Sequence, residues 1–190
     1  MSLLKTKIQV DKVNISSKEI NTNQLKELMI KIKPSNINSL IINKVVSGKI
    51  NTNLDLYFDK NLELVNLIAR GNVKEVKVKL SQNLFLDRTS FDFFFDTSDI
   101  IIKNTKTEIS GVFLKDGNFY ISRGDDIVLR SEFSSEINID KENLKNYFSF
   151  FKQLKFKDNL VYIKANLDHV LNIKFDKTLK VINYDYSNKG

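Results

Sequence analysis

In two stretches of this chain, apolar side chains recur at every second position. Residues 74–80 are KEVKVKL and residues 90–96 are SFDFFFD. Side chains two positions apart in an extended chain point to the same face, so each stretch has one apolar face. The pattern predicts β-strands with one apolar side. That side must be covered either by the protein's own helices or by an apolar ligand.

Turn-forming residues divide the chain into short strands. Clusters of Asp, Asn and Gly predict turns at residues 59–61, 71–72, 96–99, 116–118 and 124–126. Strands are expected over residues 4–15, with a bend at 11–12, and over 49–58, 63–70, 73–80, 89–95, 100–104, 107–114, 118–122, 127–139, 159–167, 169–175 and 179–186. Parallel pairing would need long crossovers, so these strands should form an antiparallel meander. We therefore expect a mostly β protein with one long, curved, antiparallel sheet and a few short helices.

Three short segments have helical periodicity. Apolar residues at i, i+3, i+4 and i+7 predict a helix over residues 23–33, ended by Pro34, and a second helix that runs into Gly48. Asp140 can cap a third helix, whose apolar stripe is Leu144, Tyr147, Phe148, Phe151 and Leu154. This stripe is more typical of packing on a sheet than of contact with a membrane surface. Residues 1–190 thus form a single segment, with a helix pair at 23–46, strands at 49–139, a helix at 141–154 and strands at 159–186.

Composition excludes several classes of function. The chain has no cysteine, which removes disulfides, thiolate catalysis and sulfur-ligated metals. Its formal charge of +7 comes almost wholly from lysines that alternate with Glu, Asp and Asn, so we expect solvated faces and no nucleic-acid partner. No stretch approaches the roughly 20 consecutive apolar residues of a membrane-spanning helix.

No catalytic constellation can be assembled from the sequence. His169 is the single histidine and falls at a predicted turn, so a Ser-His-Asp mechanism lacks its parts. GxGxxG, Walker A and HExxH motifs are all missing. Asp92 and Asp96 are expected on the wet side of a strand, and Asp125 and Asp126 in a turn. We expect no enzyme activity, no cofactor and no metal site.

The order of elements resembles the AsmA-like family. The segments QLKELMIKIKP, INSLIINKVVSG, GNVKEVKVKL, FDFFFD, DIIIKN and TEISGVFLKDG follow one another over about residues 23–139. They are most similar to the segment that precedes the AsmA C-terminal region in the very large YhdP-type proteins. Gly48, Gly71 and Gly111 fall where that family would place turns. The chain lacks the tryptophan that such proteins often carry near the first helix.

The resemblance implies a segment of a larger, repetitive protein of Gram-negative bacteria, in which the curved sheet makes a half-open, taco-like β-groove. Such a protein would be periplasmic, anchored in the inner membrane by a helix outside this segment, and would bind or conduct phospholipid acyl chains toward the outer membrane. The candidate groove residues are Leu54, Leu56, Phe58, Val76, Val78, Leu80, Phe91, Phe93 and Phe95. The alternative is a non-catalytic structural β-scaffold or protein-interaction module, in which the same residues form an ordinary core. Free sheet edges could also pair two copies into a dimer.

Overall fold

The computed structural model describes residues 10–31, 36–148, 162–178 and 180–190. The chain folds into strands β1 (Lys12–Asn21), β2 (Val45–Phe58), β3 (Leu64–Lys79), β4 (Phe85–Phe95), β5 (Asp99–Ile109), β6 (Val112–Arg123), β7 (Ile127–Asp140), β8 (Tyr162–Phe175) and β9 (Val181–Lys189). Helices α1 (Thr22–Lys31) and α2 (Asn36–Lys44) lie between β1 and β2, and α3 (Lys141–Phe148) follows β7. The predicted helix pair and third helix are confirmed within these residues, except that residues 45–46 begin β2 instead of ending the second helix. Phe151 and Leu154 lie outside them.

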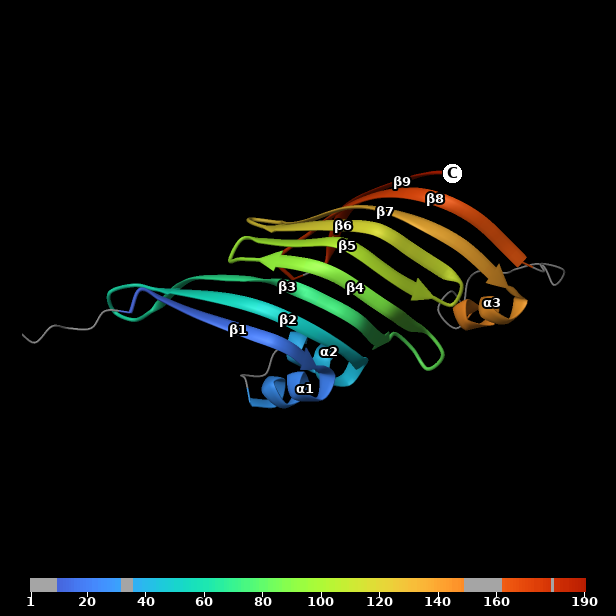
Figure 1. Ribbon diagram of the computed structural model, residues 1–190. Helices are drawn as coiled ribbons and strands as arrows, with labels where there is room; N and C mark the ends of the chain where they lie inside the picture. Colours follow the sequence, from blue (N-terminus) through green and yellow to red (C-terminus); the bar gives the residue numbers. More distant parts are fainter. Residues whose placement is uncertain (1–9, 32–35, 149–161, 179) are drawn as a thin grey trace, which may run out of the picture.

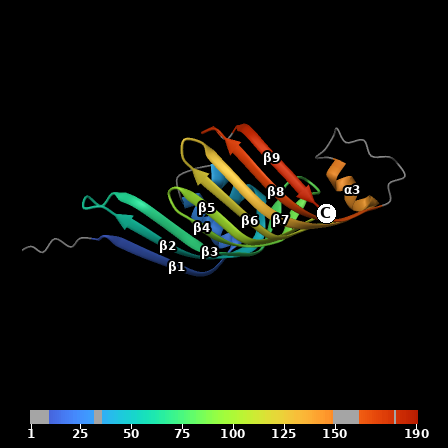
Figure 2. The ribbon, with the colours of Figure 1, turned by 90° about the horizontal axis from the view of Figure 1, so that it is seen from above.

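All nine strands form one antiparallel sheet in chain order, with β1 and β9 as its two free edges (Figures 1 and 2). Six of the eight connections are short, and the other two, after β1 and after β7, carry the helices. Each strand pairs with the strand before it in the chain, as expected for an antiparallel meander. The strands are long and bend along their length, and all three helices lie below the sheet in Figure 1. The predicted mostly β, open meander is confirmed.

Two helices begin at polar caps that the sequence supplies. Asn21 and Gln24 form a reciprocal pair, in which each side-chain oxygen accepts a hydrogen bond from the other residue's backbone N–H. Asp140 accepts one from the N–H of Asn143 at 2.7 Å, as predicted. These bonds satisfy donors that the first helical turn leaves free.

Four neighbouring strands carry a bulge at which the backbone φ angle is positive. The residues are Glu75 in β3, Arg88 in β4, Asn104 in β5 and Asp116 in β6, and each falls where the pairing register shifts. A bulge bends its strand and increases the local twist. Four bulges on adjacent strands therefore explain why the middle of the sheet curves.

Several predicted turns are wrong because they lie inside strands. Residues 71–72 sit within β3 and residues 116–118 form the bulge of β6, so the expected pairs of short strands are single long ones. The gap expected at 105–106 lies within β5, while the real turn is at Ser110 and Gly111. Strand β8 also continues through Asp168, where a hinge was expected. The other predicted turns, at 59–61, 96–99 and 124–126, are confirmed.

Glycines at two positions serve close packing instead of turns. Gly48 was expected at a helix end, but it lies inside β2 with a φ of +137°, and a Cβ there would sit 2.4 Å from the Val76 side chain. A Cβ on Gly71 would sit 2.0 Å from the backbone oxygen of Asn51. Both positions require glycine because neighbouring atoms occupy the space of a side chain.

Candidate functional site

One face of the sheet, here called the inner face, carries a row of aliphatic and aromatic side chains that crosses all nine strands. The paired residues of this apolar row are Ile15, Leu54, Ala69, Phe95, Ile100, Ile121, Leu129, Ile173 and Tyr184. A second row beside it contains Ser17, Thr52, Gly71, Phe93, Ile102, Phe119, Ser131, Leu171 and Tyr186. The sheet therefore presents one continuous, mainly apolar surface.

The opposite face, here called the outer face, is polar over most of the sheet. Its row between the two inner rows runs Ser16, Asn53, Arg70, Phe94, Ile101, Tyr120, Arg130, Asn172 and Asp185. Within this row, apolar side chains occur only over β4 to β6. The alternation of the strands thus separates the two faces, as the sequence pattern predicts.

The inner face is crowded, but the described residues leave its middle uncovered. With the exception of Asp55, all buried residues of the described strands belong to this face, and most are small: Ala69, Val73, Thr89, Thr105, Gly117, Ser131, Ser135, Ile139 and His169. The larger side chains between them, such as Phe93, Phe95 and Phe119, are only half-buried. Large apolar side chains in a closed core would be fully buried. The described helices pack against β1, β2 and β7 and leave this middle region open.

An apolar cavity of about 300 Å³ lies where the helix pair meets the inner face. Its lining comes from α1, α2 and the first four strands: Ile20, Thr22, Leu25, Ile41, Val45, Gly48, Lys49, Ile50, Val73, Val76, Val78, Leu86, Thr89 and Phe91. The helices therefore cover this end of the inner face, and the cavity lies between them and the sheet.

The third helix closes a different part of the inner face. Leu144 of α3 is 6% exposed, and the Tyr147 hydroxyl donates to the backbone oxygen of Ile109. Burial raises the pKa of Tyr147 to about 12, because the phenolate would lose its solvation. Helix α3 is thus anchored by one apolar and one polar contact.

The structure brings most of the predicted groove residues to the inner face. Leu54, Phe93 and Phe95 lie in the two rows, and Leu56 pairs with Val13 and Leu67 beside them. Val76, Val78 and Phe91 line the cavity. Two are less central, since Phe58 is the last residue of β2 and Leu80 lies just after β3.

His169 was expected in a turn, but it lies within β8 and faces the inner side. Its ring is 9% exposed and stacks on Phe133 at 4.5 Å. Nε2 is 2.7 Å from the Ser135 hydroxyl and Nδ1 is 2.8 Å from the Tyr186 hydroxyl. Burial lowers the pKa of His169, and the Asp168 carboxylate opposes this shift. The alternation of apolar residues along 163–175 could have placed His169 on this face.

The Ser135, His169 and Tyr186 side chains have the order of a nucleophile, a base and an orienting group, but they lack an oxyanion hole. Strand β7 pairs with β6 and β8, so the backbone N–H groups near Ser135 take part in the sheet. An acyl-transfer site needs free donors at that point. The two hydrogen bonds of His169 tie β7, β8 and β9 together.

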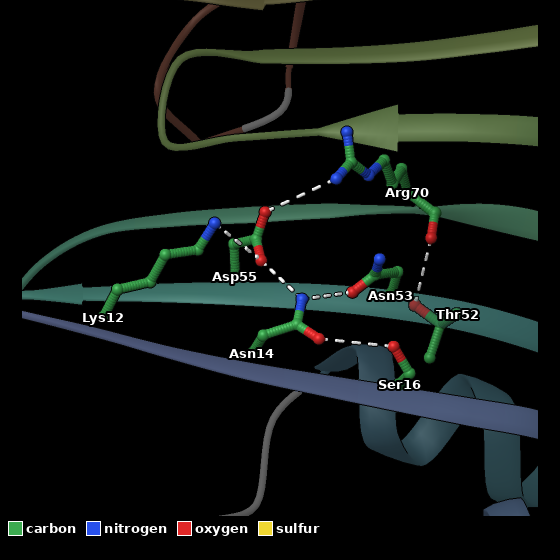
Figure 3. A network of polar contacts seen from close by, with 7 residues as sticks. All are labelled: Lys12, Asn14, Ser16, Thr52, Asn53, Asp55 and Arg70. Atoms are coloured by element: carbon green, nitrogen blue, oxygen red, sulfur yellow. Dashed lines mark hydrogen bonds and ion pairs between the residues drawn. The ribbon is translucent and has the colours of Figure 1, made fainter.

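The most elaborate polar cluster lies on the outer face around Asp55 (Figure 3). Asn14 donates to its carboxylate at 2.6 Å, the Lys12 ammonium lies at 3.2 Å and the Arg70 guanidinium at 3.6 Å. These neighbours hold the pKa of Asp55 below its usual value, with the Asn14 hydrogen bond as the largest cause. Because the partners come from β1 and β3, the cluster fastens the edge strand β1 to the sheet.

Asp92, Asp96 and Asp126, which the sequence placed on a strand or in turns, have local structural partners. Asp92 accepts from Asn104, Asp96 accepts from the N–H groups of Ser98 and Asp99, and Asp126 pairs with Lys174 at 2.6 Å. Among the described residues, no group of three His, Asp or Glu side chains could hold a metal ion. In the same part of the chain, no helix has the length and hydropathy needed to cross a membrane.

No protein-family model matches this chain, and no curated protein or solved structure is significantly similar to it. The resemblance to AsmA-like proteins therefore stays a prediction from the order of elements.

Proposed function

We propose that this chain binds phospholipid acyl chains along its inner face, as a segment of an AsmA-like bridge between the inner and outer membranes of a Gram-negative bacterium. The observation that carries the proposal is the apolar row across nine strands, whose middle members are half-buried and uncovered by the described helices. A solvent-facing apolar surface of this extent marks a binding site.

The energetics favour an apolar ligand held without specific polar contacts. Each acyl methylene removed from water contributes about 0.8 kcal/mol. Nine strands spaced about 4.8 Å apart give a row of about 38 Å, which accommodates an acyl chain lying across several strands. Carrying a lipid breaks no covalent bond, so such a surface needs no catalytic group. Anchoring by a membrane helix outside this segment, and a periplasmic location, belong to the same proposal.

A structural or protein-binding role is the second candidate, and the free edges of the sheet favour it. Every residue of β9 is exposed, and the outer edge of an edge strand offers unpaired backbone groups to another strand. In that case the inner face would pack against protein, and an edge could join two copies.

Site-specific photo-crosslinking distinguishes the two candidates. A benzophenone amino acid replaces Phe93 on the inner face or, as a matched control, Phe94 on the outer face of the same strand. After purification with native lipids, we expect mass spectrometry to find lipid adducts at position 93 and few at position 94. Protein adducts without lipid at position 93 would favour the scaffold, and no preference for position 93 would overturn the proposed function.

A further inference from the structure

We infer that the cavity between the helix pair and the sheet holds the methyl end of one alkyl chain. This cavity then forms the closed end of the lipid-binding inner face. This inference rests on the proposed function and specifies which part of the ligand enters which part of the protein. It follows from the chemistry of the cavity wall and from its connection to the inner face.

The cavity offers no hydrogen-bonding group to a ligand. The Thr22 hydroxyl already donates to the backbone oxygen of Gly48 at 3.0 Å, and the Thr89 hydroxyl bonds to that of Thr107 at 2.7 Å. The Lys49 ammonium pairs with Glu19 at 2.5 Å, and 56% of its side chain is exposed. Placing a head group here would leave its polar atoms unsatisfied, which is costly. The head group therefore stays outside.

An alkyl chain suits the same space. Cavities walled by Leu, Ile and Phe stay free of water and take up apolar molecules. Without an occupant, the wall atoms lack dispersion partners on one side. At about 300 Å³ the cavity accommodates the end of a chain and not a whole phospholipid.

The cavity adjoins the two inner rows along β4. Phe91, Phe93 and Phe95 follow one another on the same side of β4. Phe91 lines the cavity, whereas Phe93 and Phe95 belong to the two rows. An acyl chain that crosses the strands in the two rows can turn along these three rings, which lead from the open surface into the space between the sheet and the side chains of Leu25 in α1 and Ile41 in α2. The helix pair then limits how far the chain can advance.

Tryptophan quenching tests this orientation, because the chain has no tryptophan of its own. The Phe91→Trp variant places a reporter in the cavity wall, and Phe95→Trp places a matched reporter on the open face of the same strand. The probes are stearic acids with bromine atoms near the methyl end or near the carboxylate, because bromine quenches only at short range. We expect the methyl-end probe to reduce the fluorescence of Phe91→Trp more than the carboxyl-end probe does.

The two reporters separate failure of the inference from failure of the proposed function. Quenching of Phe95→Trp with none in Phe91→Trp would overturn the inference and leave lipid binding intact. Equal quenching of Phe91→Trp by both probes would also overturn it, because the chain would not enter by one end. No quenching in either variant would overturn the proposed function as well.

A cavity-filling variant gives an independent measurement. Val76→Phe adds a ring to the floor of the cavity, and Val170→Phe adds the same ring at an exposed site on the outer face. With folding verified by circular dichroism, we expect Val76→Phe to lower the affinity for stearic acid more than for a short-chain fatty acid, and Val170→Phe to change neither. An equal loss for both chain lengths would contradict insertion of the chain end.

Discussion

At the scale of single residues, Gly71 and Gly124 differ sharply in what surrounds them. A Cβ at Gly71 would meet the backbone oxygen of Asn51 at 2.0 Å, whereas at Gly124 the nearest atom is 4.0 Å away. We expect Gly71→Ala to destabilise the protein by roughly 1–3 kcal/mol, because backbone must move, and Gly124→Ala to be nearly neutral. Urea unfolding of the two variants measures this. Equal stabilities would mean that β2 and β3 do not approach as closely as described.

His169 makes stability depend on pH in a predictable direction. Its pKa is lower in the folded protein than in the unfolded chain, so folding favours the neutral ring. This contribution is complete above the unfolded pKa of about 6.5 and is lost as the pH falls from there toward the folded pKa. We expect the melting temperature to decrease as the pH falls from about 8 to about 5.5. Most carboxylates do not titrate in this range.

The control for this prediction is His169→Gln, which cannot titrate. The variant should melt lower at neutral pH, because the two hydrogen bonds to Ser135 and Tyr186 are disturbed, each worth about 1 kcal/mol. Its melting temperature should, however, change less with pH over the same range. Parallel pH profiles for the two proteins would assign the acid sensitivity to another group.

At the scale of elements, β1 depends on the Asp55 cluster for its attachment. The Asp55→Asn substitution removes the charge that Lys12 and Arg70 contact. We expect faster hydrogen exchange at the β1 amides and unchanged exchange in β7 and β8. The matched control is Glu136→Gln, whose pair with Lys115 is exposed to solvent and should contribute little. Equal exchange rates in β1 for the wild-type protein and both variants would contradict the role of Asp55.

The same cluster predicts an effect of acid on β1. Because the pKa of Asp55 is lowered, its contribution is complete above the ordinary Asp pKa of about 3.9 and is lost as the pH falls through the folded value. Detachment of β1 should therefore begin at a lower pH than the loss of the His169 contribution. The two groups can be distinguished by the pH at which each acts.

Alternation predicted most strands correctly, and its errors have one physical source. A bulge and a turn both favour residues that tolerate positive φ, so Asp116 and Gly117 look like a hairpin turn although they bend a continuous strand. The sequence placed Phe91, Phe93 and Phe95 on one face, because that depends only on local geometry. It could not predict the cavity, which depends on where the helix pair packs, nor the contact of His169 with Ser135, 34 residues away.

At the scale of the whole molecule, one open sheet with an apolar face leaves apolar side chains in water. Among the described residues, Ile15, Tyr184 and Tyr186 of the inner rows are exposed, and the buried apolar residues are few: Ala69, Val73, Leu84, Ile139 and Leu144. Exposed apolar area of this kind drives association unless a ligand covers it. The proposed lipid and a second copy of the chain would therefore compete for the same inner face.

This competition predicts that delipidated protein self-associates and that lipid reverses the association. Sedimentation velocity of the delipidated protein should detect dimers or larger species at micromolar concentration, and adding lysophospholipid below its micellar concentration should return the monomer. The control is Ile121→Asp, which places a charge in the apolar row on β6 and should weaken both self-association and lipid binding. If two copies instead associated through the edge strand β9, adding lipid would not change the association, and the Ile121→Asp variant would still dimerise. The inner face would then be closed by other means, and the structural scaffold would be the better account of this protein.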